Sequence, residues 1–359
     1  MKKHIKCIFL IIPIVFGCGD KLDINQFSSN SKNVNTAGDT VYVQLSPSWE
    51  GFSNPQAIIV GKEPFIYVCD TDNNRIVMLN TAGTVLGTKS IKQPFAIAQD
   101  YRLNLIVCAQ FDTLIGGAVN TFSAVYKIDL FAAQHDLANA PVTRILPRTA
   151  DFNYLLRKYT AVAAFYDNSY YVARNGPSNT SVYDPDNSIL KFEPKKDFNA
   201  GEGDSLIGRV PNLDPLSSGL ISANGINSMT PFNKKNVDFI ATFSGETSFK
   251  SQWFHFFVSA VEEKYVSQFF PQDGVSFAQP NKFAHPTGSC IDQYGNIFIA
   301  DAGRDSIYKF SAFGEELESF GGPSVFKSPY AVAFFDRTLY VADNGNNRIL
   351  RFILSTDLR

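Results

Sequence analysis

Three aspartates and two arginines recur at fixed offsets along the chain and are the first candidates for acid–base chemistry. Asp70 is followed by Arg75, Asp343 is followed by Arg348, and Asp301 occupies the same place in a third segment. An active site needs one constellation of reacting groups, whereas these residues return with each copy of a repeat. An Asp at a turn accepts backbone N–H groups, and an Arg can bridge to a neighbouring strand. We therefore predict a structural role for all five.

Histidines and closely spaced carboxylates are the candidates for a metal site. Beyond the first residues the chain holds His135, His255 and His285. Asp184 and Asp186 have a spacing that could attract Ca²⁺, but a turn rich in Asp and Asn explains them more simply. The phosphate-binding loop, H-E-x-x-H, G-x-S-x-G and EF-hand patterns are all missing from the sequence. We expect no resident cofactor, and a divalent cation held by carboxylate and Asn oxygens stays an open alternative.

Cysteine usage gives no sign of redox chemistry. Cys69, Cys108 and Cys290 each lie inside an apolar run, they are odd in number, and no C-x-x-C pair accompanies them. Buried thiols that pack as small hydrophobic groups are the expected state.

The N-terminal segment has the features of a signal for export. A basic start is followed by a ten-residue apolar run over 7–16, too short to span a bilayer as a helix. Gly17 and Cys18 resemble a bacterial lipobox, which implies a signal peptide over 1–17 and lipidation of Cys18. Residues 18–39 are polar and predict a flexible tether. Ordinary secretory cleavage, or a buried strand, is the alternative. The predicted location is the bacterial cell envelope, on the periplasmic side or the cell surface, with the membrane contacted through the lipid alone.

Composition favours an all-β globular protein. The 359 residues are 45% hydrophobic and only 18% charged, which is too apolar for a disordered chain. Lys and Arg number 32 against 34 Asp and Glu, so no basic field is present to attract nucleic acid. Many Gly, Pro and aromatic residues indicate strands joined by frequent turns.

The chain is built from repeats. Three segments, 54–76, 285–307 and 328–349, align almost without gaps, and three weaker copies between them bring the number to six across residues 51–354. In the weaker copies Ala109, Arg174 and Thr242 replace the repeated Asp. Each copy reads as four short antiparallel strands, and six such units predict a six-bladed β-propeller.

The repeated pattern of Pro, a strand ending in Asp, and Asn-Asn-Arg-Ile resembles the NHL repeat, and residues 40–359 resemble an NHL-type propeller lipoprotein. The last copy ends at Leu354 without a fourth strand. A strand at 41–45 can supply it and close the ring, which removes the open sheet edge.

Loop lengths locate the expected binding face. Insertions at 110–121, 175–186 and 243–251 lengthen one kind of loop in blades 2, 3 and 4, and we expect them to converge on one face. Drift in tolerant loops is the alternative. Alignment of the copies predicts a ring of polar residues at the channel mouth on that face: Asn54, Gln93, Lys158, Ser222, His285 and Ser328.

Two functions follow from these features. The first is a monomeric, non-enzymatic binding or scaffold module that recognises an envelope protein, peptide or glycan through the loop face of blades 2–4. The alternative is a metal-dependent hydrolase or lyase with a site in the central channel, because similar propellers include lactonases. The single histidine expected near the mouth, His285, favours the first.

Overall fold

The computed structural model describes residues 41–194, 204–232 and 234–358. The predicted signal peptide, Cys18 and the whole predicted tether, residues 18–39, lie outside these residues. Regular structure in the described part consists of β-strands and a few short 3₁₀ helices. Among these residues, none of the helices has the length and apolar character needed to cross a membrane.

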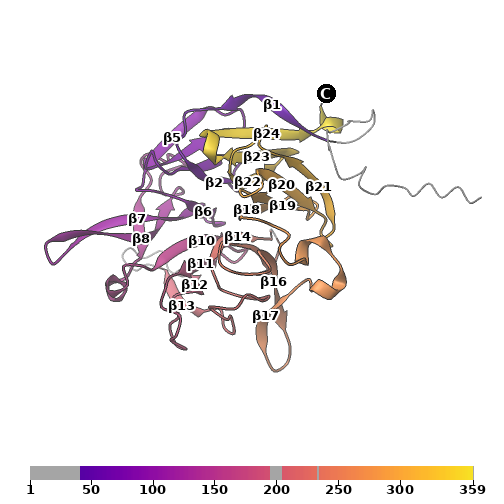
Figure 1. The fold of residues 1–359 in the computed structure, drawn as a ribbon. Coiled ribbons are helices and arrows are strands. Elements are labelled where there is room, and N and C mark those ends of the chain that lie inside the picture. The colour runs from indigo at the N-terminus through magenta and orange to yellow at the C-terminus, as the bar shows by residue number, and fades with distance from the viewer. Residues whose placement is uncertain (1–40, 195–203, 233, 359) are drawn as a thin grey trace, which may run out of the picture. The chain divides into compact units, whose positions relative to one another are not determined.

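Within the described residues, twenty-four strands form six four-stranded antiparallel sheets arranged around a central axis, which confirms the predicted six-bladed propeller (Figure 1). Blade 1 is β2 (Pro55–Val60), β3 (Ile66–Asp70), β4 (Arg75–Leu79) and β5 (Val85–Ser90). Blade 2 is β6 (Ala96–Gln99), β7 (Asn104–Ile115), β8 (Ala118–Asp129) and β9 (Val142–Leu146). Blade 3 is β10 (Lys158–Ala164), β11 (Tyr170–Asn175), β12 (Ser188–Glu193) and β13 (Ser205–Arg209). Blade 4 is β14 (Ile226–Pro231), β15 (Phe239–Phe243), β16 (Ser251–Val258) and β17 (Glu263–Ser267).

Blade 5 is β18 (Pro286–Ile291), β19 (Ile297–Asp301), β20 (Ser306–Phe310) and β21 (Glu316–Gly321). Blade 6 is β22 (Pro329–Phe335), β23 (Thr338–Asp343), β24 (Arg348–Leu354) and β1 (Tyr42–Trp49). The short helices are η2 (Thr149–Asn153), η3 (Pro271–Asp273), η4 (Ser276–Ala278), η5 (Asn344–Asn346) and η6 (Ser355–Asp357).

The predicted ring closure is confirmed. β1 pairs with β24 in antiparallel register, so that Tyr42 lies opposite Leu354 and Val43 opposite Ile353. The Tyr42 ring stacks on Phe320 of blade 5 with 4.9 Å between ring centroids. The first described strand therefore supplies the fourth strand of the last blade and also packs on its neighbour.

Apolar side chains fill the spaces between adjacent blades. The middle strands β3, β15, β19 and β23 are buried along their whole length except one end of β23, because neighbouring blades cover both faces of the sheet. Phe298, Phe310 and Phe239 are fully buried and stack on aromatic neighbours. The thiols of Cys69, Cys108 and Cys290 are unpaired and buried in these layers, as predicted, and burial raises their pKa.

The repeated aspartates accept hydrogen bonds within their own blades. Asp70 is fully buried, receives the Ser53 backbone N–H at 2.6 Å, and is paired with the Arg75 guanidinium at 2.6 Å. Asp343 repeats this arrangement with Arg348 at 2.8 Å. Asp301 likewise accepts two backbone N–H groups, from residues 284 and 285. These side chains hold each blade to the segment that leads into it.

A second polar contact joins successive blades. Asn74 and Asn347 take left-handed backbone angles just before the third strand of their blades. Their side-chain oxygens accept the backbone N–H of Gln93 at 3.0 Å and of Asn54 at 2.8 Å in the next blade. Asp305 makes the same contact with the N–H of residue 328. The second Asn of the repeated motif therefore connects its blade to the next one by a hydrogen bond, and we call this contact the inter-blade latch.

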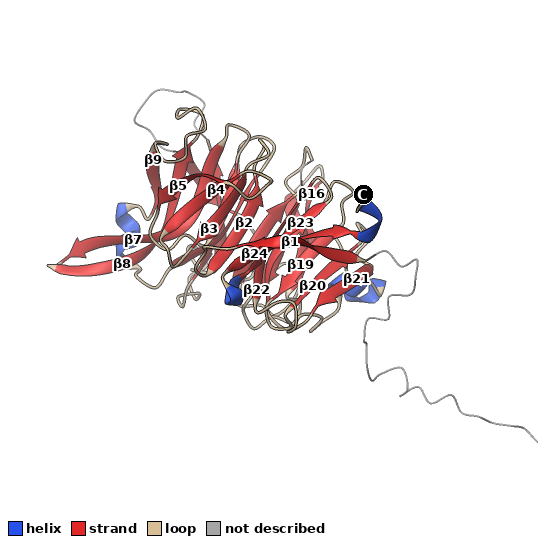
Figure 2. Cartoon of the chain, turned by 90° about the horizontal axis from the view of Figure 1, so that it is seen from above, coloured by secondary structure: helices blue, strands red, loops and turns tan. Residues whose placement is uncertain are grey.

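The three insertions differ in structure. Residues 110–121 were expected to form a loop, but they extend β7 and β8 into a hairpin that turns at Gly116 and Gly117 and protrudes from the propeller (Figures 1 and 2). Strand pairing continues to the tip because a two-glycine turn fits the twist of a hairpin. The other two insertions remain irregular between their flanking strands, over residues 176–186 and 244–250.

Candidate functional site at the channel mouth

The six inner strands β2, β6, β10, β14, β18 and β22 surround a channel along the propeller axis. In five of them the pairing with the next strand is shifted at the same place, close to the strand start. Such a bulge inserts one extra residue and re-aims its side chain. The residues at these bulges are Gln56, Thr160, Asn227, Thr287 and Tyr330, and Phe95 holds the corresponding place before β6.

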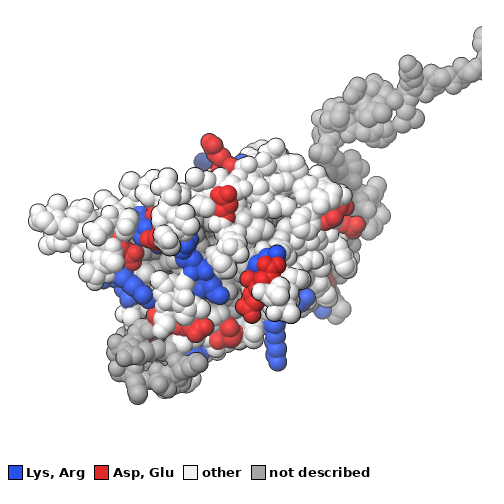
Figure 3. Space-filling view, turned by 90° about the horizontal axis from the view of Figure 1, so that it is seen from below, with Lys and Arg blue, Asp and Glu red and all other residues white. Residues whose placement is uncertain are grey.

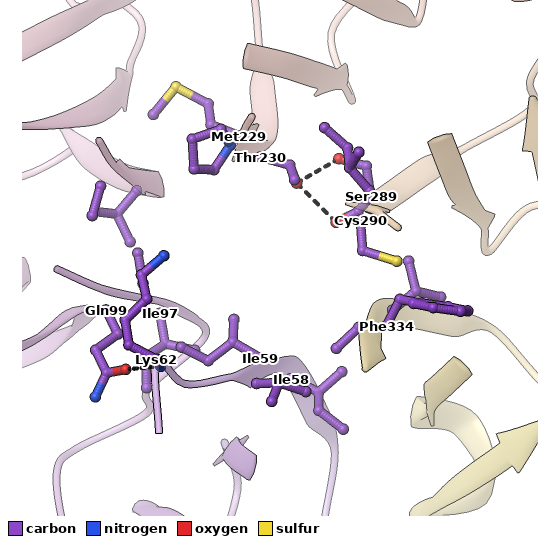
Figure 4. A pocket seen from close by; sticks show the side chains of 18 residues that line it. Ile58, Ile59, Lys62, Ile97, Gln99, Met229, Thr230, Ser289, Cys290 and Phe334 are labelled. Carbon is purple, nitrogen blue, oxygen red and sulfur yellow. Dashed lines mark hydrogen bonds between the residues drawn. The ribbon is translucent and has the colours of Figure 1, made fainter. Parts of the chain in front are cut away.

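Side chains at alternate positions form three layers down the channel, because successive residues of a strand point to opposite faces. The mouth layer is Gln56, Phe95, Thr160, Asn227, Thr287 and Tyr330. The middle layer is Ile58, Ile97, Val162, Met229, Ser289 and Val332. The far layer is Val60, Gln99, Ala164, Pro231, Ile291 and Phe334. Figure 4 shows the middle and far layers around the channel.

The mouth layer is fixed by hydrogen bonds that run from blade to blade. The hydroxyl of Thr160 donates to the carbonyl of Ile226 in blade 4 at 2.6 Å. The Asn227 amide donates to Pro286 in blade 5 at 3.3 Å, and Thr287 continues the series into blade 6. These bonds hold the side chains of Thr160, Asn227 and Thr287 in place.

A cavity of about 410 Å³ opens at this mouth. It runs from Tyr330 and Asn227 outward to the base of the β7–β8 hairpin, where Thr121 and Phe122 form one wall. Leu155, from the link between blades 2 and 3, lines the same cavity. The surface therefore combines amide and hydroxyl groups with apolar platforms, a typical composition for a small-molecule site.

Positive charge in the cavity comes from Lys158 and Arg157. The Arg157 side chain is buried and paired with Asp186 at 2.6 Å and Asp184 at 2.7 Å, so its charge is neutralised within blade 3. Lys158 is exposed and makes no ion pair among the described residues. Its ammonium is thus available to an incoming negative group. In the view of Figure 3, charges of both signs are scattered among large uncharged areas.

The phenol of Tyr330 is the other reactive group of the mouth layer. Burial raises its pKa above the ordinary value, and a hydrogen bond with Asn227 offsets part of this shift. The phenol therefore keeps its proton at neutral pH and can donate a hydrogen bond to a substrate oxygen.

Blade 3 supports the cavity with an inverted charge pair. Where blades 1 and 6 have Asp at the end of the second strand, blade 3 has Arg174, and its partner Asp184 lies in the 175–186 loop at 2.5 Å. Asp186 binds the Arg157 guanidinium and the backbone N–H of Ser178. Both carboxylates with calcium-like spacing are thus engaged by arginines.

The residues predicted for the mouth ring lie in two kinds of place. Gln93 and Lys158 line the cavity. Ser222 is fully buried in the link before blade 4 and bonds to the backbone of that link. Asn54 and Ser328 take left-handed backbone angles before their inner strands, and His285 is exposed there; none of the three is part of the cavity lining. The inner-strand bulges bring Gln56 and Tyr330, two residues farther along, to the channel instead.

The channel does not offer a typical metal site. Among the described residues there is no group of three or more His, Cys, Asp or Glu side chains that could hold a metal ion. The oxygen donors of the mouth layer are neutral amides and hydroxyls, whereas Ca²⁺ and Mg²⁺ are held in proteins chiefly with the help of carboxylates.

Comparisons with known proteins give the fold but no family. No protein-family model matches the chain, and no curated protein matches its sequence. A gluconolactonase from Xanthomonas campestris has a similar structure, with a TM-score of 0.57 and 12% identity over 88% of this chain and 90% of that one. A luciferin-regenerating enzyme matches with a TM-score of 0.57 and 12% identity over 88% and 95%. A PQQ-bound aldose sugar dehydrogenase from Streptomyces coelicolor matches with a TM-score of 0.55 and 12% identity over 88% and 99%.

These neighbours correct one prediction. We expected a non-enzymatic binding module acting through the loop face of blades 2–4, but three solved structures that match the chain along at least 90% of their length are named as enzymes. These neighbours therefore favour the alternative, an enzyme with its site at the central channel.

Proposed function

We propose that the protein hydrolyses small cyclic esters in the cavity at the channel mouth. The observation that carries the proposal is the convergence of Tyr330, Asn227 and Lys158 on one cavity that also has apolar walls. A structural neighbour named as a gluconolactonase supports the choice of a lactone.

The chemistry follows from the donors present. Water adds to the carbonyl carbon of the lactone, a C–O bond forms, and negative charge develops on the carbonyl oxygen. The ring C–O bond then breaks, and the alkoxide takes the proton that water loses, giving a hydroxy acid. The ammonium of Lys158 and the phenol of Tyr330 stabilise the developing oxyanion. Asn227, fixed by its bond to Pro286, orients the substrate.

No step of this proposal runs through a metal ion, since the residues of the channel do not fit one. Dialysis against EDTA is accordingly expected to leave the activity unchanged.

The proposal is tested by hydrolysis of glucono-1,5-lactone and γ-butyrolactone, followed by acid release. Tyr330→Phe and Lys158→Met are each expected to lower kcat/KM about 100-fold, the typical effect of removing one oxyanion donor. The matched controls Tyr294→Phe and Lys264→Met change residues outside the cavity lining and are expected to retain full activity. Failure of the wild-type protein to hydrolyse either lactone, or equal activity in all variants, would overturn the proposal.

We also propose that the propeller is of the NHL-repeat type and is anchored to the bacterial cell envelope by a lipid on Cys18. The repeat pattern and the sequence before Cys18 support this proposal. Labelling of growing cells with an alkyne analogue of palmitate is expected to mark the wild-type protein and a Cys108→Ser control but not Cys18→Ser.

A further inference from the structure

The middle layer of the channel consists mostly of apolar side chains. Five of the six middle-layer side chains are aliphatic or Met, and the sixth, Ser289, is bonded through its hydroxyl to Thr230 at 2.7 Å. Polar groups return beyond this layer, where Gln99 accepts the backbone N–H of Lys62 at 2.6 Å (Figure 4). A segment ringed mainly by aliphatic side chains thus follows directly on the polar mouth.

The channel below the mouth layer contains two cavities. A cavity of about 80 Å³ lies between the mouth and middle layers, and one of about 170 Å³ lies between the middle and far layers. Both are lined by Ile58, Ile97, Val162 and Val332, and the first also contacts Tyr330. The aliphatic side chains of the middle layer offer apolar surface to a bound ligand, whereas Thr230 and Ser289 contribute polar atoms to the walls of both cavities. Four residues of inner strand separate the mouth layer from the far layer, a depth of about 13 Å.

We propose that the channel binds the straight alkyl tail of an amphiphilic ligand whose polar head occupies the mouth cavity. The head contacts Lys158, Asn227 and Tyr330, and the tail passes Val162 and Val332 toward the far layer. This inference rests on the proposed function for the identity of the head, and it narrows the substrate class to lactones with an alkyl substituent.

Head and tail make separate contributions, which allows a binding test that does not depend on catalysis. Sodium butanoate, hexanoate, octanoate and decanoate share one anionic head and differ in tail length. Their affinity for the folded protein is measured by titration calorimetry. We expect affinity to rise about fourfold with each added methylene, until the tail fills the channel.

Four variants separate the two contributions. Val162→Phe fills the channel from blade 3 and is expected to abolish the dependence on tail length. Val332→Phe fills it from blade 6 and decides the question if the first variant does not fold. Val85→Phe adds the same bulk on β5, where the side chain is 55% exposed, and is expected to behave as wild type. Lys158→Met is expected to weaken all four acids by the same factor.

The inference is overturned if affinity does not depend on tail length in the wild type, or if the dependence is the same in Val162→Phe and Val332→Phe. A dependence that both variants abolish supports the channel as the tail site even where no lactone is hydrolysed. That last combination would refute the proposed function and leave tail binding established.

Discussion

The buried ion pairs of blade 3 make a sharp prediction about stability. Asp186 accepts a hydrogen bond from the Arg157 guanidinium at 2.6 Å and one from the backbone N–H of Ser178 at 2.8 Å. The side chains of Asp186 and Arg157 are only 2% and 5% exposed. Asp186→Asn keeps the shape but removes the negative charge, and it leaves Arg157 with two carboxylate partners, Asp184 at 2.7 Å and Asp151 at 3.6 Å.

The magnitude follows from burial. Removing one partner of a buried ion pair typically costs 3–5 kcal/mol, because the other charge is left uncompensated away from water. Since Asp184 still neutralises part of the Arg157 charge, we expect the lower end, about 3 kcal/mol. The assay is equilibrium unfolding in urea, in which the midpoint falls while the slope stays unchanged.

Asp112→Asn is the matched control. Asp112 pairs with Lys92 at 2.5 Å, as short a contact as that of Asp186, but the two side chains are 42% and 40% exposed. Water and salt screen such a pair, so we expect its loss to leave the urea midpoint within error of the wild type. Equal midpoints for Asp186→Asn and Asp112→Asn would refute the argument that burial decides the contribution.

Two further predictions concern pH and the inter-blade latch. Burial raises the pKa of Asp184, but hydrogen bonds from Arg174 and Arg157 outweigh it and hold the pKa below its ordinary value. Asp184 therefore stabilises the fold above about pH 4, and this contribution is lost as the pH falls through the lower folded-state value. Wild type and Asp184→Asn are expected to differ in urea midpoint at pH 7 and to converge below pH 4; a constant difference would contradict the assignment. Asn347→Ala removes the bond to Asn54 and places Ala at a φ of 58°, so we expect a loss of about 1–2 kcal/mol. Asn347→Gly, which tolerates this backbone, is expected to recover part of that loss in the same urea assay; no recovery would assign the whole effect to the hydrogen bond.

The six blades and their closure could be predicted from the sequence. The constant offsets from Pro55 to Asp70 and from Pro329 to Asp343 reflect local physics, because strand length and turn chemistry repeat in every blade. The role of Asp70 with Arg75 followed from the same repetition. The strand at 41–45 was predictable because the last copy lacks a fourth strand and an open edge is unfavourable. The hairpin over 110–121 was missed, although Gly116 and Gly117 are the sequence signal of a two-residue turn.

The site depended on the tertiary structure. A bulge places two residues of one strand opposite one of the next, and alternation in the sequence does not reveal it; this is why Tyr330 rather than Ser328 reaches the channel. In the sequence, Arg174 merely replaces the repeated Asp. Its ion pair with Asp184, which lies in the following loop, is visible only in the folded structure. The apolar middle layer joins single residues from six blades, so its character becomes visible only when the ring is closed. Local interactions repeat from blade to blade and can therefore be predicted from the sequence. The channel could not be predicted in this way, because it is formed by residues that are distant in the sequence.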